Sequence, residues 1–372
     1  MGQSIEDFTI GVEEEYQIVN PETRGLRQRA QRILLKAQEA VGKDVTNELF
    51  QSQIEIGTPI CKTLGEVRAE LIRLRSGLIN AAKREGSRIV AAGTHPFSHW
   101  ENQSITPKPR YYGIAADFQQ VAREQIIFGC HVHVGISDRE LAIQVMNRAR
   151  PWLAPLLALA TNSPFWLGME TGYSSYRTEL FQRFPMVGTP NVLASRTEYD
   201  DLVSALVATG SISDASKIYW DIRPSSHFET IEFRVTDVCA SIEEAVMVAG
   251  LCRALARTCY GHAERGLPIE HARPELLRAA KWRASRYGLD RELIDIDARL
   301  AVPAAQLIEK FLEFLRPTLE DAGEWDEIGT LVRETLDRGT GAKRQRDVYT
   351  KRGRFEDVVD HLIKETARGT EP

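Results

Sequence analysis

The sequence predicts an α+β fold, in which a helical C-terminal third packs on a largely antiparallel sheet. Three segments alternate apolar and polar residues with the two-residue period of a half-buried strand, at 8–19, 126–136 and 230–236. Strands and helices are otherwise mixed, without the strict alternation that a parallel sheet requires. From Pro274 onward almost every segment has helical periodicity. We therefore expect one domain over 1–372, sheet-rich over 1–240 and helical over 241–372.

Length and composition are typical of a globular protein with a large core. The chain has 372 residues, of which 43% are hydrophobic and 27% are charged. Its 47 basic and 52 acidic residues give a formal net charge of -5, which does not favour nucleic acid as a partner. One local basic run, between residues 343 and 354, is more typical of a solvated face or a phosphate-binding tail.

Cysteine usage and apolar run lengths indicate a cytoplasmic protein. The 5 cysteines include no C-x-x-C pair and no zinc-ligand spacing, so we interpret them as free thiols in a reducing compartment. The N-terminus lacks the basic and apolar regions of a secretory signal, and no apolar stretch has the length of a membrane span. We therefore expect no membrane as a partner.

Helices can be placed by periodicity and by capping residues. Apolar residues at helical spacing predict a helix over 64–85, and Ser241 with Glu244 forms a capping box before a helix that ends near Arg265. A helix over 137–160 is expected to be interrupted near its two prolines. Further helices are expected at 195–208, 274–287, 303–315, 319–338 and 354–366, with a short strand at 88–93.

The first and last of the alternating strands each carry charge on one face. Glu13 and Glu15 share a face of the first strand, and two carboxylates at this spacing can bridge or flank magnesium ions. An exposed acidic edge would have the same pattern. Glu232 and Arg234 share a face of the last strand. Covering such charges is costly unless they are paired, solvated or bound, so these faces are candidate sites.

Three other glutamates need separate explanations. Glu14 falls on the apolar side of the first strand, so either that side is partly exposed or Glu14 has a partner. Glu48 and Glu55 would face opposite sides of an unbroken strand. If both are functional, the chain near Glu48 must bend or precede the strand; otherwise both are solvated surface residues.

His131 and His133 stand opposite the apolar side chains of the middle strand. Such a pair can bind zinc in hydrolases, although histidine pairs are often structural. A metal-dependent amidohydrolase would need further ligands late in the chain, and the late histidines all lie in predicted helices, which weakens that alternative. If the three strands share a sheet, Glu13, Glu15, His131 and Glu232 could converge in one cleft.

Two arginines lie outside the periodic segments. Arg177 lies in 164–190, which we interpret as an irregular functional loop, and Arg223 lies just before the last strand. Arginine suits fork-like pairing with phosphate or carboxylate oxygens, although lone loop arginines are usually surface residues. The common phosphate-binding motifs GxxxxGK[ST] and GxGxxG are absent, so any nucleotide must be held by metal and arginine.

Six motifs between about Phe8 and Tyr349 carry a family resemblance: GVEEEYQIVNPET, THPF, GCHVHVG, SSYR, WDIRPSSHFETIEFRVTD and GTGAKRQR. Together they resemble the glutamate-cysteine ligase 2 family, also called carboxylate-amine ligases. The resemblance implies a glutamine-synthetase-like fold, in which the sheet forms an open funnel with helices packed on its outer face. ATP would enter one end of the funnel and glutamate the other, with two or three Mg²⁺ ions between them.

The resemblance also implies roles for particular residues. The metal ligands would be Glu13, Glu15, Glu48, Glu55, His131 and Glu232. Arg177, at the transferred phosphoryl group, and Arg234 would be catalytic, while Arg223 and Ser225 would bind the nucleotide. More distant ligases carry another residue at the position of His133.

In this family the γ-carboxylate of glutamate would attack the γ-phosphate of ATP, and an amine would then attack the resulting acyl phosphate. The sequence is therefore expected to encode an ATP- and Mg²⁺-dependent ligase with L-cysteine as the acceptor, and the helical C-terminal third is compatible with a homodimer. The alternatives are a ligase for a different amine, a metal-dependent hydrolase that acts without ATP, and a non-catalytic nucleotide-binding protein. The last of these would be expected to have lost ligands that this chain retains.

Overall fold

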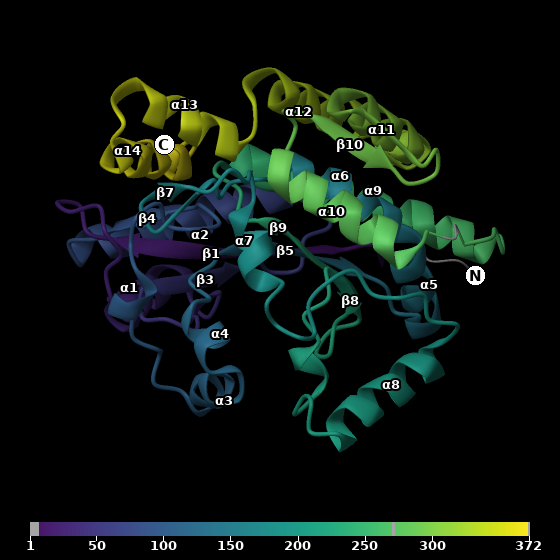
Figure 1. The fold of residues 1–372 in the computed structure, drawn as a ribbon, viewed down its shortest axis with the longest axis horizontal. Coiled ribbons are helices and arrows are strands. Elements are labelled where there is room, and N and C mark those ends of the chain that lie inside the picture. The colour runs from purple at the N-terminus through teal and green to yellow at the C-terminus, as the bar shows by residue number, and fades with distance from the viewer. Residues whose placement is uncertain (1–6, 270–271, 371–372) are drawn as a thin grey trace.

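A seven-stranded antiparallel sheet forms the centre of the protein (Figure 1). The computed structural model describes residues 7–269 and 272–370. The strand order is β2-β3-β1-β5-β9-β8, and β4 also pairs with β1. These strands are β1 (Ile10–Val19), β2 (Val45–Asn47), β3 (Gln53–Gly57), β4 (Arg88–Val90), β5 (Gly129–Gly135), β8 (Ile222–Pro224) and β9 (Thr230–Asp237). Every pairing in the sheet is antiparallel, which confirms the predicted sheet type.

The strand register brings the charged faces of the predicted strands together. Glu13 of β1 lies opposite His131 of β5. On the other side of β1, Glu15 lies opposite Glu55 of β3. β5 in turn pairs with β9, where His133 lies opposite Glu232. The three polar faces therefore belong to one sheet, as the prediction of a shared cleft requires.

Helices cover the opposite face of this sheet. Two long helices, α2 (Leu64–Arg84) and α9 (Ile242–Glu264), lie against β1 and β5, and α14 (Phe355–Ala367) lies against β4. α9 begins with the predicted capping box of Ser241 and Glu244 and is buried along most of its length. The apolar side chains of the strands are buried beneath these helices, among them Val12, Val132 and Phe233.

The remaining elements surround this core. They are α1 (Ala30–Val41), α3 (Pro109–Phe118), α4 (Gln120–Arg123), α5 (Arg139–Ala149), α6 (Leu153–Leu159), α7 (Tyr176–Phe181), α8 (Arg196–Ala208), α10 (Pro274–Tyr287), α11 (Ala304–Asp321), α12 (Trp325–Arg338) and α13 (Gly341–Arg352), with the strand pairs β6 (Phe165–Trp166) and β7 (Met169–Glu170), and β10 (Glu292–Asp295) and β11 (Leu300–Pro303). A short turn that contains Pro151 separates α5 from α6, as predicted. The five cysteines are buried free thiols.

The structure differs from the elements expected in the C-terminal third at three points. The helix predicted to end at Leu315 continues through Pro317 as α11, and Gly323, with φ of 69°, separates it from α12. The segment that forms α13 was not predicted to be helical, because its almost entirely polar sequence has no apolar stripe. The hairpin of β10 and β11 lies within the part expected to be helical.

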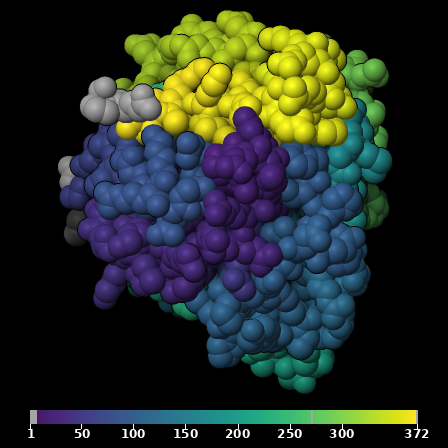
Figure 2. All heavy atoms as spheres, turned by 90° about the vertical axis from the view of Figure 1, so that its left-hand side faces the viewer, coloured from purple at the N-terminus to yellow at the C-terminus, as the bar shows by residue number. Residues whose placement is uncertain are grey.

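The C-terminal helices also pack against the N-terminal third of the chain (Figure 2). Figure 2 shows the C-terminal segment, in yellow, directly above the purple and blue segments. One contact is the ion pair between Arg24 Nε and Asp360 Oδ1 of α14, at 3.0 Å. No helix in the described part of the chain combines the length and the apolar character that crossing a membrane requires.

Candidate active site

A cavity of about 480 Å³ opens on the charged face of the sheet. Its walls come from β1, β3, β5, β9 and α7, from the turn after β2, and from the loop that joins β8 to β9. All the residues predicted for the site line it: Glu13, Glu15, Glu48, Glu55, His131, Arg177, Arg223, Ser225, Glu232 and Arg234. The structure thus brings the predicted residues together, while the roles assigned to them stay predictions.

Three carboxylates form a tight group in this cavity. Glu15 and Glu55 project from paired strands, Glu48 reaches them from the turn after β2, and one oxygen of each lies within 4.8 Å of the others. The chain bends between Glu48 and β3, which allows both to face the same side. Burial and the neighbouring Glu48 raise the pKa of Glu15 to about 7. Burial and repulsion from Glu13 also raise the pKa of Glu55 well above its usual value. A bound cation would remove this repulsion.

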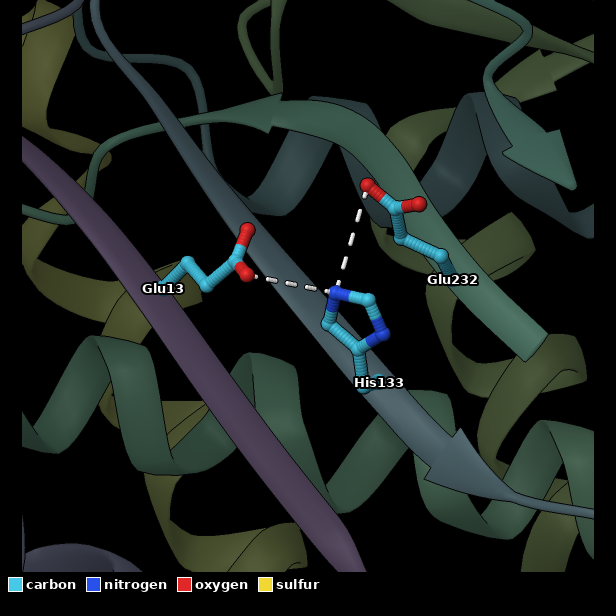
Figure 3. A group of neighbouring side chains, drawn as sticks. All are labelled: Glu13, His133 and Glu232. Atoms are coloured by element: carbon cyan, nitrogen blue, oxygen red, sulfur yellow. Dashed lines mark ion pairs between the residues drawn. The ribbon is translucent and has the colours of Figure 1, made fainter. Parts of the chain in front are cut away.

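A second group contains Glu13, His133 and Glu232, from three neighbouring strands (Figure 3). His133 Nε2 points between the two carboxylates, 3.5 Å from Glu13 Oε1 and 4.0 Å from Glu232 Oε1. This nitrogen is buried and has no hydrogen-bond partner among the described residues, whereas Nδ1 lies 2.9 Å from the hydroxyl of Thr230. A ring oriented through Nδ1, with Nε2 aimed at two carboxylates, suits a metal ligand.

His131 contacts the other oxygen of Glu13 and lies outside this group of three. Its Nδ1 is 3.4 Å from Glu13 Oε2. Burial, together with the positive charge of Arg234, lowers the pKa of His131 to about 4, so its ring is neutral at pH 7. Metal binding was predicted for His131, with His133 left unassigned. The geometry favours His133 as the partner of Glu232, and the ligand role of His131 stays a prediction.

Glu232 is held between two arginines. Arg223 Nε donates to Glu232 Oε2 at 2.8 Å, and Arg234 Nη1 donates to Glu232 Oε1. Burial alone would raise the pKa of Glu232, but Arg234 and Arg223 together lower it far below its usual value. Arg223 is fixed further because its Nη1 donates to the carbonyl oxygens of Ser216 and Ile218. Glu232 is therefore a carboxylate, and Arg223 is a buried part of the site rather than a surface arginine.

Arg177 presents an unpaired guanidinium to the cavity. It is buried, and its Nη2 donates a long hydrogen bond of 3.5 Å to Arg234 O. Among the described residues, its Nε has no hydrogen-bond partner and no carboxylate forms an ion pair with it. The expectation of an irregular loop is corrected here, because Arg177 lies on the short helix α7, which begins where Ser175 accepts a hydrogen bond from Thr178 N. A Cβ at Gly129 would lie only 2.3 Å from Arg177 Nη2, so the guanidinium needs glycine at this position.

Asp237 anchors the segment that carries Arg177, and sequence reasoning missed it. One of its oxygens accepts hydrogen bonds from Asn162 N and Ser163 Oγ, each at 2.7 Å, and the other accepts one from Ser175 Oγ at 2.7 Å. Ser163 Oγ in turn accepts the backbone N–H of Arg177. A charged residue at the end of an otherwise buried strand was the available signal for this role.

The cavity also has an apolar wall that was not predicted. The residues are Tyr111, Ile114, Ile127, Phe181, Phe184 and Tyr219. The rings of Phe184 and Tyr219 lie 5.5 Å apart. At the rim, Phe228 is 61% exposed and stands edge-on to His133. Several of these residues belong to α3 or to the segment after α7, whose structure the sequence pattern did not indicate.

The basic run near the C-terminus lies outside this cavity. Most of its charges pair with carboxylates: Lys343 with Asp347, Arg344 with Glu244, Arg346 with Glu170, Arg352 with Asp357, and Arg354 with Glu356. Because the pairing neutralises the run, a role in nucleic-acid binding is not supported.

Comparison with known proteins relates this fold and cavity to a family. Residues 9–361 match the family model of glutamate-cysteine ligase family 2 (GCS2). The chain belongs to this family. Two relatives, from Solibacter usitatus and Herpetosiphon aurantiacus, are 43% and 41% identical to it, and each alignment covers 97% of this chain and 94% of the relative. Both carry the name "Putative glutamate–cysteine ligase 2". As a family 2 member, the chain is a carboxylate-amine ligase.

Solved structures establish the fold of this family 2 ligase. A glutamate–cysteine ligase from Francisella tularensis in complex with AMP superposes with a TM-score of 0.72 at 13% identity, over 98% of this chain and 89% of that chain. A bifunctional glutathione synthetase from Pasteurella multocida gives a TM-score of 0.70 at 14% identity, over 98% of this chain and 53% of that one. The glutamine-synthetase-like fold expected from the sequence is confirmed.

Proposed function

We propose that this protein uses ATP and Mg²⁺ to join the γ-carboxylate of glutamate to an amine through an acyl phosphate. L-Cysteine is the proposed acceptor, which makes the product γ-glutamylcysteine. The observation that carries the proposal is one cavity with two separate groups of potential cation ligands beside an unpaired arginine. A phosphoryl transfer between two anions needs this combination of charge neutralisation and positioning.

The donor set of the cavity fits Mg²⁺. Glu15, Glu48 and Glu55 offer only carboxylate oxygens, the ligands that hard cations prefer. In the second group, the buried Nε2 of His133 has no hydrogen-bond partner among the described residues and lies between two carboxylates, so a bound cation could take all three as ligands. When bound, ions held by these residues would neutralise negative charge on the phosphate groups.

The residues of the chain would then position the reactants. Arg177 would donate to the transferred phosphoryl group and stabilise charge that develops on it. Arg234 would stay oriented by Glu232 while its remaining N–H groups face substrate, and Arg223 with Ser225 would hold the nucleotide at the loop between β8 and β9. The apolar wall that contains Phe184 and Tyr219 would limit the access of water to the acyl phosphate.

Phosphate release provides the direct test. Purified protein is incubated with ATP, Mg²⁺ and glutamate, and with each natural amino acid in turn as the acceptor. We expect release that depends on both glutamate and the acceptor, with L-cysteine the best, and a γ-glutamyl product of the matching mass. If phosphate were released only with other amines, cysteine would not be the acceptor, but the ligase proposal would stand. No release with any amine, or product formation without ATP, would contradict the ligase proposal.

A further inference from the structure

A second cavity, of about 270 Å³, lies between the segment around β7, the end of α10 and α13. Its lining residues are Glu170, Gly172, Ser174, Arg286, Tyr287, Asp290, Arg291 and Arg346, none of which lines the active cavity. A water molecule takes about 30 Å³ of liquid volume, so this space exceeds what a single ion needs. It could therefore hold a small organic molecule.

Two of its three arginines have no acidic partner in the described part of the chain. Arg286 stacks on the rings of Tyr173 and Tyr287, with its Cζ 5.4 and 4.9 Å from the ring centroids, and Arg291 stacks on Tyr287 at 5.4 Å. Within the described chain, neither guanidinium forms an ion pair or donates a side-chain hydrogen bond. Stacking fixes the planes of these groups but leaves their N–H edges free for a ligand.

The third arginine is held rigidly at the cavity wall. Arg346 pairs with Glu170 at 3.0 Å and donates to Tyr173 O at 2.6 Å and to Ser174 Oγ at 3.2 Å. Gly172 adopts φ of 78°, and a Cβ there would lie 3.4 Å from the guanidinium carbon of Arg286. The positive φ favours glycine at this position, and an added Cβ would only touch the guanidinium.

The charges that line the cavity favour an anion. The lining residues include three guanidinium groups and two carboxylates, and one of these carboxylates, Glu170, is already paired with Arg346. The C-terminal end of α10 adds about half a negative charge, which leaves the cavity positive. We propose that this cavity binds a small phosphate monoester, with its phosphoryl group between Arg286 and Arg291. Arg286 is at the end of α10 and Arg291 is in the loop that follows it, and two guanidinium groups can donate several charge-assisted hydrogen bonds to the oxygens of one phosphoryl group.

Hydrogen bonds connect this site to the helix that carries Arg177. Ser285, next to Arg286 on α10, accepts the backbone N–H groups of Ser174 and Ser175 through its carbonyl oxygen, each at 2.8 Å. Its hydroxyl donates to Glu179 of α7 at 2.7 Å. A ligand that fixes the end of α10 against the segment before α7 would therefore also restrain α7. These hydrogen bonds connect the second cavity to α7 whatever reaction the active cavity performs.

The probes are inorganic phosphate and glycerol phosphate, titrated by calorimetry at constant ionic strength without Mg²⁺ or nucleotide. The variants are Arg291→Gln, at an exposed position where the fold should tolerate it, and Arg283→Gln as the matched control. Arg283 also lies on α10 and stacks on Tyr287, but it pairs with Glu292 outside the cavity. Loss of one charge-assisted pair should weaken binding roughly 10- to 100-fold in Arg291→Gln and leave Arg283→Gln unchanged. Amide exchange of residues 174–181 should slow on addition of ligand only where binding persists.

Equal binding by wild type and Arg291→Gln, or no binding by wild type, would overturn the proposal. Phosphate could also bind in the active cavity, so Arg177→Ala is titrated in parallel. Binding that Arg177→Ala abolishes and Arg291→Gln preserves would place the anion in the active cavity and overturn the second site. Thermal unfolding in phosphate-free buffer verifies that each variant is folded.

Discussion

The unpaired guanidinium of Arg177 makes the sharpest prediction at the scale of single residues. Replacing Arg177 with alanine should lower kcat of the proposed ligase by about 10²–10³-fold, because a preorganised donor to the transferred group is lost. Arg177→Lys should recover only part of this, since the ammonium lacks the planar fork. Steady-state phosphate release measures both. Arg183→Ala, which removes an exposed arginine just after α7 that pairs with Glu124, is the matched control. Near-normal turnover by Arg177→Ala would remove this residue from catalysis.

His95 makes stability depend on pH at a position away from the active cavity. Its Nε2 contacts Arg24 O at 2.9 Å, and its Nδ1 accepts the backbone N–H groups of Phe97 and Ser98. Burial lowers the pKa of His95 to about 4, from the ordinary value of about 6.5 for histidine. Between these two values the unfolded chain binds a proton that the folded protein does not, so His95 stabilises the fold above pH 6.5 and this contribution is lost as pH falls toward 4.

The size of this effect can be isolated by substitution. Going from pH 7 to pH 5, wild type should lose roughly 2 kcal/mol of unfolding free energy more than His95→Asn, because asparagine can replace the hydrogen bonds but does not titrate. Urea unfolding at both pH values measures the difference. Only the change of unfolding free energy between the two pH values is compared. A loss of stability in His95→Asn that is equal at both pH values therefore does not affect the result. Parallel pH dependences for the two proteins would refute the assignment.

At the scale of elements, the buried pair of Glu14 and Arg75 joins β1 to α2. Both side chains are 0% exposed; Arg75 Nε donates to Glu14 Oε2 at 2.9 Å, and the hydroxyl of Tyr16 donates to the same oxygen. Arg75→Met should cost about 3–5 kcal/mol of unfolding free energy, because it leaves a buried carboxylate unpaired. The double variant Glu14→Leu, Arg75→Met should cost less than Arg75→Met alone, as denaturant unfolding can measure. A double variant less stable than Arg75→Met would show that the pair is not the main interaction.

This pair also shows where prediction from sequence ends. Alternation along β1 correctly separated Glu13 and Glu15 from the core and marked Glu14 as anomalous, because strand periodicity is local. The partner of Glu14 lies 61 residues away, on a helix whose own pattern gave no sign of it. The fold class followed from such local patterns and from family motifs.

Parts of the site that depend on tertiary contacts were not predictable in the same way. The helical setting of Arg177 depends on Asp237 of β9, and the choice of His133 beside Glu232 depends on the pairing of β5 with β9. The apolar wall depends on elements, such as α3, that the periodicity did not reveal. Residue types on one strand face could be predicted, whereas the geometry between strands and helices could not.

At the scale of the whole molecule, the acidic cavity should make global stability depend on divalent cations. Without a cation, the close carboxylates of Glu15, Glu48 and Glu55 repel one another and destabilise the folded state. A cation that binds only the folded state adds RT ln(1 + [L]/Kd), about 2.7 kcal/mol at a concentration 100 times Kd. Mg²⁺ should therefore raise Tm of the wild type by several degrees relative to buffer with chelator.

Glu55→Gln should change Tm differently without and with a divalent cation. Glu55→Gln removes one of the mutually repelling charges, so it should raise Tm in chelator, and it removes a cation ligand, so it should reduce the increase caused by Mg²⁺. Glu309→Gln, at an exposed position on α11, changes the net charge equally and should alter neither value. Calorimetric unfolding of the three proteins with chelator and with Mg²⁺ measures all six values. If Glu55→Gln lowered Tm in chelator and kept the full response to Mg²⁺, the carboxylate would stabilise the fold rather than bind a cation, and the proposed metal site would lose one of its ligands.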